Sequence, residues 1–137
     1  MLFPTFSTVG SGLGVFRTWM DAVSDNLANI NTVRPTSEAA FQPRFVVATA
    51  IGGGQEAMTG GPAGARVTGI AFGDAAGRLM QDPTNPLADA AGMVRLPDID
   101  MGDQMTQLMV AQRGYQANLA VIDRARDAYQ QALTIGR

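Results

Sequence analysis

The sequence predicts an α+β fold in which one helix at each end of the chain flanks a small β-rich insert. Hydrophobic residues recur at alternating spacings of three and four near the N-terminus and again near the C-terminus, which is typical of amphipathic helices. Between these segments the chain is rich in glycine and proline and holds only short β-prone runs. We therefore divide the 137 residues into an N-terminal helical segment (1–34), a central insert (35–99) and a C-terminal helical segment (100–137).

The N-terminal helix is predicted from one apolar face with a heptad spacing. This face comprises Leu13, Phe16, Met20, Val23, Leu27 and Ile30. Ser11 can cap the helix, or Ser7 can if the helix starts earlier, whereas the three glycines within residues 10–14 weaken its first turns. The helix should end near Asn31, because Pro35 disfavours helical geometry at the residue before it.

The C-terminal helix is predicted from a longer face of the same kind, about 43 Å long at 1.5 Å per residue. The face comprises Met105, Leu108, Gln112, Tyr115, Leu119, Ile122, Arg126, Tyr129 and Leu133. Asp100 should cap the helix, with Asp103 as an acidic residue in the first turn. Gln112 and Arg126 interrupt the face, and polar residues at such positions can fix the register of paired helices at some cost in stability.

The insert is predicted from breakers that separate short β-prone runs. Turn signals include the glycines at 52–54, Asp82-Pro83 and Asn85-Pro86. The β-prone runs are Arg44–Ile51, Arg66–Phe72, Leu79–Gln81 and Met93–Leu96. The glycine-rich stretch at 52–64 is predicted to be mobile, since glycine has the greatest backbone freedom.

The composition predicts a thin core that neighbouring molecules complete. Hydrophobic residues make up 46% of the chain but aromatic residues only 7%, so few bulky side chains are available to fill a core. Val15, Val110 and Val121 lie off the two heptad faces, and Trp19 lies at the flank of one. A helix with apolar residues on more than one face is expected to have neighbours on more than one face.

Missing residue types exclude most catalytic and metal chemistry. The chain has no cysteine and no histidine, and all ten of its basic residues are arginine. Thiol nucleophiles, imidazole bases, the usual zinc ligands and Schiff-base lysines are therefore excluded. The carboxylates Asp82 and Asp89 are explained by turn chemistry rather than by acid–base work. We expect no enzyme activity, no cofactor and no metal.

Charge and hydropathy exclude other classes of function. The net charge is −2, and the arginines are interleaved with acidic residues instead of forming a basic stripe, so nucleic-acid binding is not expected. No apolar run reaches the roughly 20 residues of a membrane span. The N-terminus lacks a positively charged region before an apolar stretch, so we expect no cleaved signal peptide.

Four motifs resemble those of the flagellar axial proteins, the family of rod, hook and hook-associated proteins. Residues 24–32 (SDNLANINT) resemble the N-terminal signature of this family, and residues 105–118 (MTQLMVAQRGYQAN) resemble its C-terminal signature. Residues 65–70 and 82–94 resemble elements of the short proximal rod members. Asn85 and Met93 depart from that pattern, where the family usually has histidine and tyrosine.

The resemblance implies a structural subunit of the proximal rod, whose terminal helices pair as a coiled coil and assemble into a tube that transmits torque. It implies passage through the flagellar export apparatus, a location in the basal body across the periplasm or cell wall, and partners that are copies of the chain and other rod proteins. It adds Asn26, Asn29 and Asn118 to the assembly face. Gly114 could let another helix approach closely.

Three alternatives remain open at this point. One is a different axial rod subunit that carries the same signatures. Another is a self-contained cytoplasmic adaptor that folds alone into a coiled coil. The third is a carboxylate hydrolase that acts on the cell wall, for which the sequence supplies no supporting pair of acids.

Overall fold

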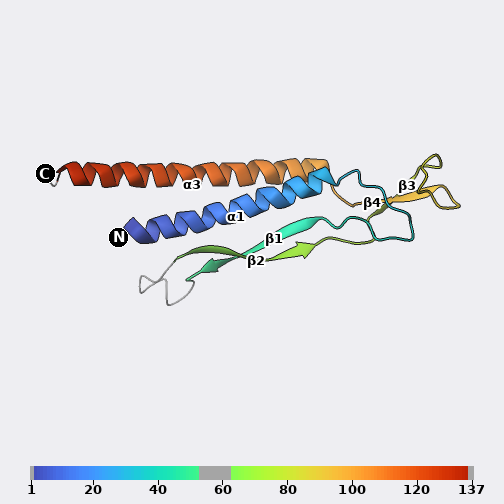
Figure 1. Ribbon diagram of the computed structural model, residues 1–137, viewed down its shortest axis with the longest axis horizontal. Coiled ribbons are helices and arrows are strands. Elements are labelled where there is room, and N and C mark those ends of the chain that lie inside the picture. The colour runs from blue at the N-terminus through green and yellow to red at the C-terminus, as the bar shows by residue number, and fades with distance from the viewer. Residues whose placement is uncertain (1, 53–62, 136–137) are drawn as a thin grey trace. The chain divides into compact units, whose positions relative to one another are not determined.

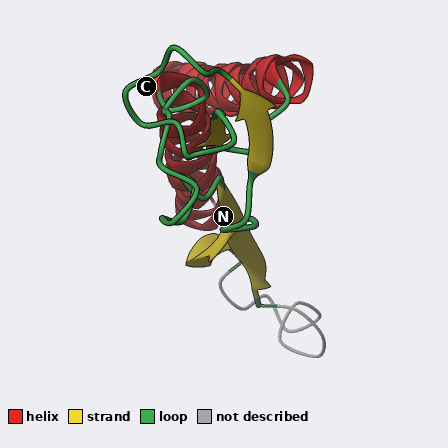
Figure 2. Ribbon diagram, turned by 90° about the vertical axis from the view of Figure 1, so that its right-hand side faces the viewer, coloured by secondary structure: helices red, strands yellow, loops and turns green. Residues whose placement is uncertain are grey.

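The computed structural model describes residues 2–52 and 63–135, and the fold is α+β (Figures 1 and 2). The elements in chain order are α1 (Leu2–Ala28), β1 (Arg44–Ile51), β2 (Gly64–Phe72), β3 (Arg78–Gln81), β4 (Met93–Leu96) and α3 (Met101–Ile135). The predicted order of helix, β-rich insert and helix is confirmed. The mobility predicted for 52–64 falls largely on residues 53–62, which lie outside the described residues.

The strands form two small antiparallel sheets, β1 with β2 and β3 with β4 (Figure 1). All four β-prone runs become strands, and each boundary agrees with the prediction to within two residues. In the second sheet Arg78 lies opposite Leu96, and Gln81 lies opposite Met93. Arg34 adds a single antiparallel bridge to Arg95, so the residue before Pro35 is extended, as expected.

Helix α1 begins earlier than the serine caps predicted. It starts at Leu2 and runs through the three glycines without a break. A proline near the start, Pro4, is tolerated because the first N–H groups of a helix have no intrahelical acceptor. Ser11 is not a cap, and its hydroxyl instead donates to the carbonyl of Thr8, 2.7 Å away. Of the three glycines, Gly12 lies against Asn118 of α3, whereas Gly10 and Gly14 have nothing within 4 Å of the position of an added Cβ.

The other helix boundaries follow local capping chemistry. The last turn of α1 gives way to a turn at residues 29–31, close to the predicted end at Asn31. Asp100 caps α3 as predicted, since its Oδ1 accepts a hydrogen bond from the Asp103 N–H at 2.8 Å.

The described chain divides into two compact units. Unit 1 comprises residues 1–20, 47–69 and 109–137, and unit 2 comprises residues 21–46 and 70–108. The core lies almost entirely in unit 2, where the buried hydrophobic residues are Ala22, Val23, Ile30, Ala40, Val94, Leu96 and Ile99. In the described part of unit 1 the only buried hydrophobic residue is Ala111. The thin core expected from composition is therefore concentrated in one unit.

Within unit 1, α1 packs on α3 through glycine positions. A Cβ at Gly12 would lie 2.8 Å from the Nδ2 of Asn118, and a Cβ at Gly114 would overlap the ring of Phe16. Because Gly12 faces Asn118 while Phe16 faces Gly114, the two helices run antiparallel here. The close approach predicted for Gly114 is confirmed, and the helix that approaches belongs to the same chain.

The other side of α1 in unit 1 holds the start of β2. Thr8 Oγ1 donates to the carbonyl of Ala63 at 2.8 Å, and the Ala65 N–H donates to Ser11 Oγ at 3.0 Å. A Cβ at Gly64 would collide with the Ser11 side chain. Side chains of α1 thus pair with backbone groups at and just before the start of β2.

Unit 2 is held together by a tight turn and an arginine. Gly77 has φ +57°, which favours glycine, and a Cβ there would collide with the carbonyl of Leu96 and with Ala40. The Arg95 guanidinium donates to the carbonyls of Ala76 and Thr36. The loop before β1 and the second sheet are therefore fixed to each other by the close packing at Gly77 and by the hydrogen bonds of the Arg95 side chain.

Candidate functional site

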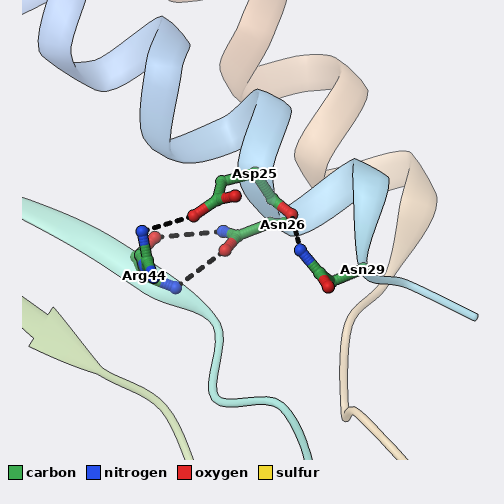
Figure 3. Close-up of polar contacts among 4 residues, drawn as sticks. All are labelled: Asp25, Asn26, Asn29 and Arg44. Carbon is green, nitrogen blue, oxygen red and sulfur yellow. Dashed lines mark hydrogen bonds and ion pairs between the residues drawn. The ribbon is translucent and has the colours of Figure 1, made fainter. Parts of the chain in front are cut away.

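The N-terminal signature folds into a polar junction in unit 2, centred on Asn26 (Figure 3). Only 1% of Asn26 is exposed. Its Oδ1 accepts from the Arg44 N–H at 2.8 Å, and its Nδ2 donates to the Arg44 carbonyl at 3.0 Å. The same Nδ2 donates to Gln104 Oε1 at 3.0 Å. One amide therefore joins α1, the first residue of β1 and the first turn of α3.

The neighbours of Asn26 support this junction. The Asp25 carboxylate forms an ion pair with the Arg44 guanidinium, so Arg44 is held by both its backbone and its side chain (Figure 3). Asn29 Nδ2 donates to the carbonyl of Asp25 at 2.9 Å, and its Oδ1 accepts from Thr32 Oγ1 at 3.2 Å. Asn29 therefore stabilises the end of α1 rather than a contact between helices of this chain.

Gln104 is the partner that heptad counting missed. It is 4% exposed and lies on the face of α3 that meets α1. The less exposed positions of this face are Gln104, Leu108, Ala111, Gly114, Tyr115, Asn118, Ile122 and Ala125. A seven-residue repeat of small or amide residues (Gln104, Ala111, Asn118, Ala125) was the signal that could have identified them.

The predicted assembly residues differ in exposure. Val23, Asn26 and Ile30 are buried. The partly buried ones are Leu13, Phe16, Met20, Leu27, Asn29, Leu108, Tyr115, Asn118 and Ile122. The exposed ones, all on α3, are Met105, Gln112, Leu119, Arg126, Tyr129 and Leu133. The less exposed face of α3 therefore contains Leu108, Tyr115 and Ile122 of the heptad face. It also contains Gln104, Ala111, Asn118 and Ala125, each one residue before an exposed member of that face.

The insert motif at residues 82–94 forms the connection between β3 and β4. Asp82 accepts from Thr84 Oγ1 and Asn85 Nδ2 at 2.9 and 3.2 Å. Asp89 Oδ1 accepts from the Ala91 and Met93 N–H groups, both at 2.9 Å. The interpretation of these acids as turn residues agrees with this geometry.

The pKa of Asp89 reflects its role in the turn. The hydrogen bond from the Met93 N–H, followed by that from Thr36 Oγ1, holds the pKa of the Asp89 carboxyl below its ordinary value of 3.8. Among the described residues no group of three acidic side chains is arranged to hold a metal ion. Nor does any helix in that part of the chain have the length and hydropathy needed to cross a membrane.

Comparison with known proteins identifies the family. Residues 90–135 match the family model described as the C-terminal region of the flagellar basal body rod proteins FlgEFG. A flagellar basal-body rod protein FlgC of Yersinia enterocolitica is 34% identical over 137 residues, which cover 99% of this chain and 98% of that protein. The chain belongs to the FlgC family of flagellar basal-body rod proteins. FlgC proteins are structural subunits of the rod, so the resemblance of the terminal signatures is confirmed.

The FlgC relationship extends across distant bacteria. The FlgC protein of Escherichia coli O6:H1 is 31% identical over 136 residues, covering 99% of this chain and 98% of its own length. The FlgC protein of Bacillus subtilis is 29% identical over 147 residues, covering 98% of each chain. Both terminal helices and the insert of this chain therefore have counterparts in FlgC proteins.

Proposed function

We propose that this rod subunit works by pairing its terminal helices as a coiled coil and packing them against copies of itself and against other rod proteins. Residues 1–34 and 100–137 then act together as the helical assembly domain, and residues 35–99 act as a separate insert. The observation that carries this proposal is the apolar surface left on α3 after it has packed on α1. Met105, Leu119, Tyr129 and Leu133 are each 40% or more exposed.

The assembly face is the set of residues predicted from the heptads and the two signatures. Its exposed part, on α3, meets neighbouring subunits, and its buried part sets the geometry of α1 on α3. Burial of apolar side chains between subunits contributes roughly 25 cal/mol per Å², which compensates for the thin core of each subunit. The tube that results transmits torque, and the protein has no catalytic role.

The proposal extends to the route and place of assembly. The chain passes through the flagellar export apparatus and joins the rod where it crosses the periplasm or cell wall. Its terminal segments stay partly disordered until they reach the growing end, because a folded helix pair would hinder export. Folding and assembly are then coupled, with intersubunit burial offsetting the ordering entropy.

Replacing Leu119 with aspartate tests the assembly face. A charge at this exposed position should block incorporation into rods and swimming, while the exported amount of the protein stays unchanged. Ser37→Asp adds the same charge at an exposed position of the loop before β1 and serves as the control. Normal swimming with Leu119→Asp would contradict the assignment of this face. Normal rods in cells lacking the chain would contradict the function itself.

A further inference from the structure

Helix α3 leaves two exposed flanks in unit 1 besides the face that meets α1. Residues three or four apart share a face of a helix, so each flank can be followed along the sequence. The valine flank comprises Val110, Arg113, Ala117, Val121, Arg124 and Ala128. The methionine flank comprises Met109, Gln112, Gln116, Leu119, Asp123 and Asp127. All twelve residues are exposed, and the flanks lie about 120° apart around the helix.

The two flanks are complementary in size. Val110 and Val121, 49% and 41% exposed, stand on either side of Ala117, so the valine flank is shallow. Met109 and Leu119, 49% and 40% exposed, are longer and more flexible side chains. Bulky side chains from one helix fit into the spaces between small ones on another, as they do in packed helix pairs.

The flanks are also complementary in charge. The valine flank carries two arginines, Arg113 and Arg124, and no acid, whereas the methionine flank carries two aspartates, Asp123 and Asp127, and no arginine. The two ion pairs found among the described residues involve other groups, so in residues 2–52 and 63–135 these four charges have no ionic partner. Arg126 lies between the methionine flank and the face that meets α1.

We propose that the valine flank of one copy packs against the methionine flank of a second copy, with their α3 helices parallel and nearly level. In that arrangement Arg124 of one copy lies beside Asp123 and Asp127 of the second copy, and Arg113 lies beside its glutamines. The proposal rests on the proposed function and identifies the contact between neighbouring copies. Because the valine flank and the methionine flank differ, each added copy leaves one flank open for the next copy. The contact therefore repeats around a ring or a helical assembly.

Isolated surface charges alone would not justify this contact, since exposed ion pairs contribute only about 0–1 kcal/mol. The argument depends on the sorting of charge, and of the size of the apolar side chains, onto two separate faces of one helix. A solvated helix surface does not require that sorting. A repeating contact between unlike faces does, because it needs the two faces to match.

Charge reversal on each flank tests the contact in the full chain. One variant carries Arg113→Glu with Arg124→Glu, so both its flanks are acidic, and the other carries Asp123→Arg with Asp127→Arg, so both are basic. Arg17→Glu with Arg66→Glu, at exposed positions of α1 and β2, reproduces the charge change of the first variant away from the flanks. Sedimentation velocity measures self-association at about 0.02 M and about 0.5 M salt, between which screening becomes strong.

We expect the wild-type chain and the control to self-associate at low salt, and each flank variant to need at least about tenfold higher concentration. An equimolar mixture of the two flank variants should recover association, because each acidic flank then meets a basic one. The proposal is overturned if the wild-type chain stays monomeric, if the flank variants associate as the wild type does, or if the mixture fails to recover.

One further variant covers loss of structure. If circular dichroism shows that a charge-reversed variant has lost helicity, Arg113→Gln with Arg124→Gln replaces it. This neutral variant should associate more weakly than the wild type, and its association should no longer depend on salt. Equal association, or an unchanged salt dependence, would overturn the proposal. Failure of the proposed function would instead appear as normal rods in cells that lack the chain.

Discussion

At the residue scale, Asn26 shows why the signature of this chain contains an amide at a buried helix position. The side chain offers two N–H donors and one carbonyl acceptor, and all three are used by Arg44 and Gln104. Asparagine has only moderate helix propensity, so local preference does not select it. It is favoured because it joins segments 18 and 78 residues away in the sequence.

Asn26→Asp should strongly destabilise unit 2 although the two side chains have nearly the same shape. The change replaces two donated hydrogen bonds with a second acceptor oxygen that faces the Arg44 carbonyl and Gln104 Oε1. A lost pairing of this kind costs about 1–3 kcal/mol per buried group. We therefore expect the free energy of unfolding to fall by about 2–4 kcal/mol. Urea denaturation measures it. Asn31→Asp, at an exposed position, is the control, and equal effects at both sites would contradict the role of Asn26.

Asp89 should make the turn between β3 and β4 sensitive to acid. Its pKa in the folded state lies below the ordinary 3.8, so the carboxylate stabilises the turn fully above that pH. This contribution is lost as the pH falls through the lowered pKa. The protection factors of the Ala91 and Met93 amides, measured by NMR between about pH 5 and pH 2 and corrected for the intrinsic pH dependence of exchange, should fall over this range. Asp89→Asn should remove the pH dependence, and an unchanged dependence would assign it to another group.

At the element scale, Gly114 of α3 and Gly14 of α1 have opposite roles. Gly114 lies where Phe16 approaches α3, and Phe16 is stacked on Trp19 with ring centroids 6.2 Å apart. Gly14 has nothing within 4 Å of the position of an added Cβ. Gly114→Ala should lower the free energy of unfolding by about 1–2 kcal/mol through overpacking, despite its better helix propensity. Gly14→Ala should raise it by about 0.5–1 kcal/mol. Thermal unfolding of both variants tests this pair, and a shift of the same sign in both would contradict the close approach at Gly114.

The sequence predicted the elements better than it predicted their faces. Strand positions followed from β-branched runs between glycine and proline breakers, and the Asp100 cap followed from side-chain chemistry. The start of α1 could not be predicted, because tertiary contacts of Gly12 override its propensity. The face of α3 that meets α1 was predicted only in part: heptad counting found Leu108, Tyr115 and Ile122 but missed Gln104 and Ala111, because it favours large apolar side chains. Ala111 is buried on this face because it is small enough for α1 to lie close. Gln104 is buried there because Asn26 of α1 donates a hydrogen bond to it.

At the scale of the whole molecule, the two units differ in how much core they contain. Unit 2 holds nearly all the buried side chains among the described residues, together with the Asn26 junction and the Gly77 turn. Unit 1 relies on partly buried side chains such as Phe16 and Trp19 and leaves both flanks of α3 exposed. Sequence composition indicated a thin core, but only the structure could show its distribution, because that depends on which segments meet.

Hydrogen exchange should therefore differ between the units in the isolated full-length chain. Amides of unit 2 should exchange slowly, because opening them exposes a core and unpairs Asn26, whereas amides of unit 1 should exchange faster. The boundary should fall inside both helices, near residue 20 of α1 and residue 109 of α3, rather than at their ends. When copies of the chain associate, protection should rise mainly on α3 of unit 1, where the valine and methionine flanks become covered. Uniform protection along both helices before assembly would show that unit 1 is stable without neighbours, and coupled folding and assembly would then lose its physical basis.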